Sequence, residues 1–95
     1  MPLYTVIAQL KGEEYIDQVR ARSPRAALTR WAKSVNAKAV GLTERRTQQL
    51  VMEVSDPENP CVAIEGAENI WRMAALVGRM LVMIIVVRTH ETGGF

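Results

Sequence analysis

The sequence contains little of what most enzyme and metal sites are built from. It has one cysteine, Cys61, and one histidine, His90, among 95 residues. One thiol cannot form an internal disulfide, and one Cys with one His cannot complete a zinc site. No P-loop and no GxGxxG segment is present, so nucleotide binding has no motif. We therefore expect no catalysis, no metal and no cofactor, and the lone thiol fits a cytoplasmic location.

Aromatic residues and net charge are also low, at 5% and +2. No platform of exposed aromatics for stacking bases is therefore predicted. The charge is unevenly spread, because residues 1–46 carry nine Lys/Arg against four Asp/Glu, whereas residues 47–95 carry three against six. A basic face in the first half predicts nucleic-acid binding as one alternative, although a merely solvated face gives the same pattern. Its candidate contacts are Arg20, Arg22, Arg25, Arg30 and Lys33.

The longest apolar run is Met80–Val87, eight residues without a polar one. As a strand it presents apolar side chains to both faces of a sheet, so both faces should be covered. A membrane span over 70–87 is disfavoured because Arg72 and Arg79 interrupt it. The N-terminus also lacks the basic region that precedes the apolar part of a signal peptide. We expect no contact with a membrane.

The first 36 residues predict a hairpin followed by a helix. The strands are 3–10 and 14–22, and Gly12-Glu13 serves as the two-residue turn. In that register Leu10 faces Tyr15, and the side of the sheet that carries them is the core side. Ser23-Pro24 is a helix start, with serine as the N-cap and proline in the first turn. The helix covers 24–36, ends at Asn36 and buries one stripe: Ala27, Leu28, Trp31, Ala32 and Val35.

The middle of the chain leaves alternatives open. Residues 43–54 fit a helix capped by Thr43, whereas 50–54 fit a strand equally well. The segment 55–60 holds two prolines and is a loop. Residues 61–64 are a candidate for a short strand.

The last third predicts a second hairpin, 69–89, that turns at Gly78-Arg79. Both of its faces are apolar. One carries Trp71, Met73, Ala75, Val77, Val82, Ile84 and Val86, and the other carries Ile70, Ala74, Leu76, Leu81, Met83, Ile85 and Val87 together with Arg72. A helix over 67–77 is the competing interpretation, because its apolar residues also have helical spacing.

These elements predict one α+β domain over residues 1–90 and a flexible tail, 91–95. Its antiparallel sheet has about four strands, with the helices packed on one face. The elements are two hairpins, 3–22 and 69–89, and one or two helices, 24–36 and, in the helical interpretation, 44–54.

A sheet with helices on one face leaves the other face bare, although the last hairpin is apolar on both sides. Several hundred Å² of contiguous apolar surface is more than soluble monomers usually expose. We therefore expect a non-catalytic protein–protein interaction module, either a homodimer or a binder of another protein. The alternative within one chain is that 43–54 and 55–66 cover this face. The predicted interface residues are Trp71, Met73, Val82, Ile84 and Val86.

The segment 4–33, YTVIAQLKGEEYIDQVRARSPRAALTRWAK, resembles the ββα opening of HicB-like antitoxins. It pairs a short hairpin with a helix that has a small capping residue and an alanine-rich start, here Ser23 to Leu28. The family's proline- and glycine-containing segment after the second strand is absent, as is a recognisable C-terminal DNA-binding domain. The resemblance implies a partial double-stranded-RNA-binding-like α+β fold and a role in neutralising a protein partner.

Overall fold

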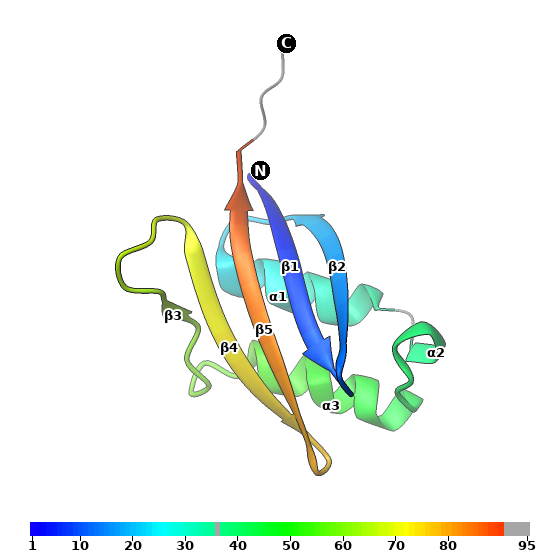
Figure 1. Ribbon diagram of the computed structural model, residues 1–95. Coiled ribbons are helices and arrows are strands. Elements are labelled where there is room, and N and C mark those ends of the chain that lie inside the picture. Colours follow the sequence, from blue (N-terminus) through cyan, green and yellow to red (C-terminus); the bar gives the residue numbers. More distant parts are fainter. Residues whose placement is uncertain (36, 91–95) are drawn as a thin grey trace.

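Five antiparallel strands form one sheet in the order β2-β1-β5-β4-β3 in the computed structural model, which describes residues 1–35 and 37–90 (Figure 1). Asn36 and the predicted tail 91–95 lie outside these residues. The prediction of a helix over 24–36 is too long, because α1 ends at Ser34 and Val35 is already extended, with ψ 134°. The α+β class is confirmed, with a fifth strand beyond the four predicted. The strands are β1 (Leu3–Leu10), β2 (Glu13–Arg20), β3 (Val62–Ala63), β4 (Ile70–Val77) and β5 (Met80–Thr89).

The first hairpin has the predicted core side but a different register. Leu10 pairs with Glu13, so the turn is Lys11-Gly12 and not Gly12-Glu13. Lys11 and Gly12 both have positive φ, 53° and 78°, as a type I′ turn requires. Each residue of β1 therefore pairs with a β2 residue two positions from the predicted partner. Because side chains alternate between the faces with a period of two, each one stays on its predicted face.

Two helices of about three turns begin at the predicted start signals. In α1 (Pro24–Ser34) the hydroxyl of Ser23 accepts a hydrogen bond from the amide of Ala26 at 3.1 Å, as an N-cap does. The segment 43–54 is helical: α3 (Glu44–Ser55) starts at Thr43, whose hydroxyl accepts from the amide of Arg46 at 3.2 Å. The short helix α2 (Ala37–Val40) was not predicted.

The second hairpin has the predicted register. Val77 pairs with Met80, and Gly78 takes a φ of 64°, a left-handed value that glycine adopts without cost. The competing helix over 67–77 is therefore wrong. β3 pairs with β4 and confirms the short strand considered at 61–64. No helix within the described residues is long and apolar enough to cross a bilayer.

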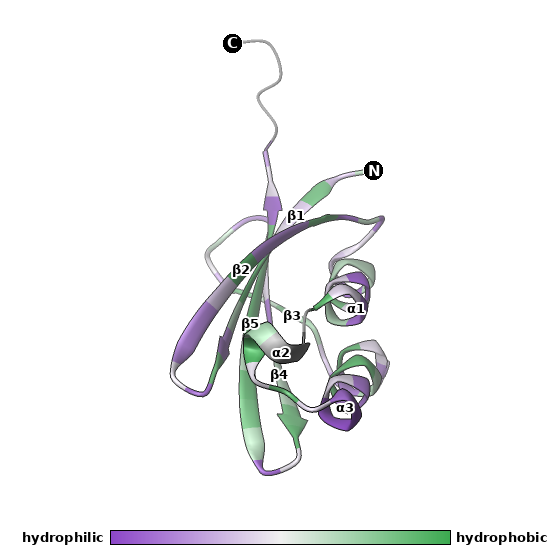
Figure 2. Cartoon of the chain, turned by 90° about the vertical axis from the view of Figure 1, so that its right-hand side faces the viewer, coloured by the Kyte–Doolittle hydropathy of each residue, from purple (hydrophilic) through white to green (hydrophobic). Residues whose placement is uncertain are grey.

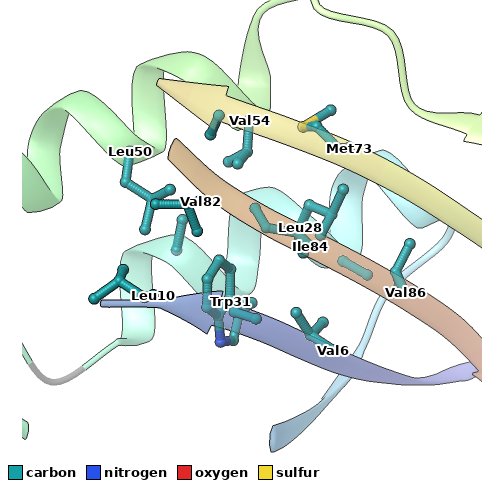
Figure 3. Packing of buried hydrophobic residues seen from close by; sticks show 14 of the residues in the cluster. Val6, Leu10, Leu28, Trp31, Leu50, Val54, Met73, Val82, Ile84 and Val86 are labelled. Atoms are coloured by element: carbon teal, nitrogen blue, oxygen red, sulfur yellow. The ribbon is translucent and has the colours of Figure 1, made fainter. Parts of the chain in front are cut away.

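The core lies between the sheet and the helices. α1 and α3 lie side by side on one face of the sheet, and no helix or strand of the described residues lies on the opposite face (Figure 2). From the helices come Leu28, Trp31, Leu50 and Val54, which meet alternate residues of the central strands (Figure 3). The alternative in which 43–54 and 55–66 cover the second face is thus contradicted, because α3 packs against α1 and β4 on the first face.

Candidate interaction surface

The residues predicted to contact a partner lie in the core of the chain itself. Met73, Val82, Ile84 and Val86 are 2% exposed or less, and Trp71 is half-buried on the same face. They point toward α1 and α3, and Trp71 packs edge-to-face on Tyr4 with ring centroids 6.2 Å apart. The prediction that the last hairpin is apolar on two faces is confirmed, but the interface prediction named the face that the helices cover.

The surface left available is the other face of the sheet, which we call the open face. Its central row crosses all five strands at one level, because Ile7 pairs with both Ile16 and Ile85, and Arg72 pairs with Ile85. Val62 of β3 ends the row. The remaining side chains of the open face above and below this row are Leu3, Thr5, Gln9, Glu14, Gln18, Arg20, Ile70, Ala74, Leu76, Leu81, Met83, Val87 and Thr89.

Large apolar side chains of the open face are well exposed to solvent. The exposed fractions run from 39% for Ile85 to 64% for Ile16. Such a patch is on the order of 500 Å², near the upper limit of the largest patches found on soluble monomers. The exposed members are Ile16, Val62, Leu76, Leu81, Met83 and Ile85.

Polar side chains on the open face are concentrated on β2 and its neighbour β1. Gln9 donates its amide to Glu14 at 3.1 Å, and Gln18 donates to the hydroxyl of Thr5 at 3.2 Å. Across the sheet, Arg72 stands exposed on β4 between apolar neighbours. The open face therefore has an apolar centre and one guanidinium on β4, and β2 carries a carboxylate at Glu14 and the guanidinium of Arg20 at the opposite end of the strand.

Two shallow hollows flank the exposed side chain of Met83. The first, about 310 Å³, has Glu14, Gln9 and Leu81 in its lining. The second, about 250 Å³, has Arg72 and Val62. A surface with one ridge between two hollows can accept side chains from a partner. The second hollow is mostly apolar, and such pockets hold the anchor residues of interfaces, whereas the first also has charged residues in its lining.

The residues predicted to contact nucleic acid do not form one free basic surface. Arg25 is half-buried, and its guanidinium donates to the carbonyl oxygens of Val54, Asp56 and Asn59, so it fastens the end of α3 to α1. Arg30 donates to the carbonyl of Arg20 at 2.8 Å. The side chain of Arg20 donates to the carbonyl of Met1 and belongs to the open face of β2, whereas Arg22 and Lys33 are exposed beside and on α1.

The two residues considered for catalysis are also placed. Cys61 is half-buried against the core, and burial raises the pKa of its thiol, while the nearby charge of Arg25 acts in the opposite direction. A raised pKa leaves less of the reactive thiolate at neutral pH. His90 is exposed where β5 has ended. Within residues 1–35 and 37–90, no three His, Cys, Asp or Glu side chains gather as metal ligands.

One residue of the sequence, Arg72, distinguishes the open face of the last hairpin from the covered face. Among residues 70–77 and 80–87, only one of the two apolar faces contains a charged residue, Arg72, and a fully buried face rarely keeps an unpaired charge. The face with Arg72 is the one that the helices leave open. Comparison with known proteins adds no second line of evidence: no protein-family model matches the chain, and neither do any curated proteins or solved structures.

Proposed function

We propose that this protein is a non-catalytic protein–protein interaction module and that the open face is its binding surface. The observation that carries the proposal is the row of large apolar side chains across the uncovered face of a five-stranded sheet. Burying apolar surface stabilises a complex by roughly 25 cal/mol per Å² before the costs of association.

The open face has the composition of an interface and not that of a solvated sheet surface. An antiparallel sheet with one solvated face usually alternates apolar and polar residues along each strand. In β5, however, the alternate residues that point outward, Leu81, Met83 and Ile85, are all apolar. Polar side chains on β1 and β2 form a rim beside this apolar centre, and such a rim is typical of protein interfaces.

The partner belongs to one of two kinds, a second copy of the chain or a different protein. A neutralised protein partner is what the resemblance to HicB-like antitoxins implies, and it would use the same surface. Nucleic-acid binding is not proposed as a second function, because the guanidinium of Arg25 and that of Arg30 donate to backbone carbonyl oxygens of the protein itself.

Capture of partners by the tagged full-length protein from a native lysate tests the proposal. The variant Ile85→Lys places a charge at the centre of the open face, and Met52→Lys is the matched control, since Met52 is 72% exposed on α3. We expect Ile85→Lys to lose the bound protein, whether a second copy or another chain, and Met52→Lys to retain it. Equal capture by both variants and the wild type would contradict the proposal.

A further inference from the structure

The charges of the open face are arranged so that the face complements a copy of itself. Glu14 lies on the edge strand β2, whereas Arg72 lies on β4, two strands beyond β1. Between them, the central strands contribute Ile7 and Ile85. When such a face is turned about a two-fold axis, Glu14 of one copy meets Arg72 of the other, while Arg20 lies at the opposite end of β2.

We infer that the open face packs on the open face of a second copy, about a two-fold axis that lies between the two sheets, parallel to the strands, above the boundary of β1 and β5. The inference rests on the proposed function and names its partner. This operation places β2 of each copy over β4 of the other and β1 over β5. Two sheets packed in this way keep their strand directions within about 30° of each other.

The centre of such an interface is apolar on both sides. Ile7 and Ile85 are cross-strand neighbours at one level of the sheet, so the two-fold axis brings Ile7 of each copy against Ile85 of the other. One level further along the strands, Gln9 and Met83 are neighbours in the same way. Each of these contacts occurs twice, because the interface is isologous.

The flanks of the interface explain the arginine on an otherwise apolar part of the sheet. Arg72 stands at the level of Ile16, which is the most exposed large apolar side chain of the sheet. In the dimer, the aliphatic stem of Arg72 covers the other copy's Ile16, as long basic side chains cover apolar surface elsewhere. Its guanidinium then reaches Glu14, the next residue on that face of the same strand, whose carboxylate Gln9 already holds in place.

The available area matches what a small stable dimer needs. Standard interfaces bury about 800 Å² on each partner, with slightly more than half of it apolar. The exposed apolar patch of the open face, on the order of 500 Å², together with its polar rim on β1 and β2, provides such an area.

Charge reversal tests this arrangement on the full chain by sedimentation velocity at micromolar concentration. We expect the wild type to sediment at twice the 10.6 kDa mass of the chain. Glu14→Arg and Arg72→Glu each place two like-charged pairs in the dimer and weaken it on the order of a hundredfold. The double variant Glu14→Arg/Arg72→Glu restores opposite charges and returns the dissociation constant to near the wild-type value. Both side chains are exposed in the single chain, so thermal melting should show every variant folded.

Matched controls carry the same charge changes outside the open face. Glu58→Arg in the loop after α3 and Arg45→Glu on α3 are exposed, and they should leave the dimer unchanged. A dimer insensitive to the single reversals, or one that the double variant does not restore, overturns the arrangement. A monomeric wild type overturns self-association. In that case, capture of another protein that Ile85→Lys abolishes would still uphold the proposed function, and its absence would reject both.

Discussion

The two faces of the sheet are built from neighbouring residues of the same strands but differ in what covers them. Along β5, Val82, Ile84 and Val86 are at most 1% exposed beneath α1 and α3, whereas Met83 and Ile85 between them are 43% and 39% exposed. The side chains of the two sets are similarly apolar. Burial in this protein is therefore set by where the helices pack and not by the hydrophobicity of the strand.

The difference teaches that an apolar strand by itself does not say which of its faces forms the core. Both helices pack on the same face of the sheet, as the edge-on view shows (Figure 2). Burial of the covered face stabilises the fold, whereas the open face leaves its apolar side chains exposed, available for the association proposed above. Changing one residue on each face should separate these two roles.

The largest expected effect is the difference between two variants that introduce a charge at neighbouring residues of β5, Ile84 on the covered face and Ile85 on the open face. Ile84→Glu places a carboxylate in the core without a partner, and we expect a loss of more than about 4 kcal/mol, enough to unfold a small domain. Ile85→Glu should leave the free energy of unfolding of the single chain within about 1 kcal/mol of the wild-type value. Urea denaturation followed by circular dichroism measures both.

Similar stability of the two variants would contradict the assignment of the faces. Concentration matters for the Ile85 variant, because a dimer adds stability that depends on protein concentration. The two proteins should therefore be compared at several concentrations, and the smallest difference between Ile85→Glu and the wild type is expected at the lowest one.

A smaller effect is expected when the helical cover is loosened at Arg25. Its guanidinium donates to three carbonyl oxygens at and beyond the C-terminal end of α3, where a positive charge also interacts favourably with the helix dipole. Arg25→Ala should lower the free energy of unfolding by about 2–3 kcal/mol. The control Arg22→Ala removes an exposed arginine and should change it by less than about 0.5 kcal/mol. Equal effects in thermal melts would show that Arg25 does not fasten α3.

The elements that the sequence predicted well are those with local causes. Ser23 before Pro24 marks the start of α1, and Gly78 fixes the turn and register of the second hairpin. The first turn was misplaced because lysine rarely adopts positive φ, yet Lys11 does so at 53°. Its ammonium group donates to the carbonyl of Gly41 at 2.7 Å, a contact between segments far apart in the sequence. A tertiary contact of this kind cannot be seen in a turn motif.

The residues proposed for the interface could not be placed from the sequence, again for a physical reason. The two-sided apolar pattern of 69–89 predicted apolar side chains on both faces of the sheet, and the structure has them. Choosing between the faces required knowing where α3 packs, and that depends on a contact with β4, on the anchoring by Arg25, and on the hydrogen bond from the amide of Gly78 to the side chain of Gln49 at 2.9 Å. The same arginine looked like a nucleic-acid contact because sequence spacing does not show which guanidinium is used inside the fold.

The smallest expected effect is a pH dependence of stability that measures the burial of Cys61, which lies just before β3. Cys61 packs there against the core, and burial raises the pKa of its thiol above the ordinary value of 9.0. The unfolded chain therefore loses the thiol proton first, so stability should fall as the pH rises above about 9. The cause of the raised pKa of Tyr15 is different: its hydroxyl donates to Glu13, and its contribution has the same sign but begins near pH 10.

Comparison of the wild type with Cys61→Ala measures how much the thiol contributes to this pH dependence. Urea midpoints measured between about pH 8 and pH 9.5, a window around the ordinary thiol value, should decline more for the wild type than for Cys61→Ala. Alkylation by iodoacetamide gives an independent reading, because the pH at which the rate is half-maximal should lie higher for the folded protein than for the protein in urea. Identical profiles in the two states would mean that Cys61 is as hydrated as an open-face residue, and the covered face would then end before β3.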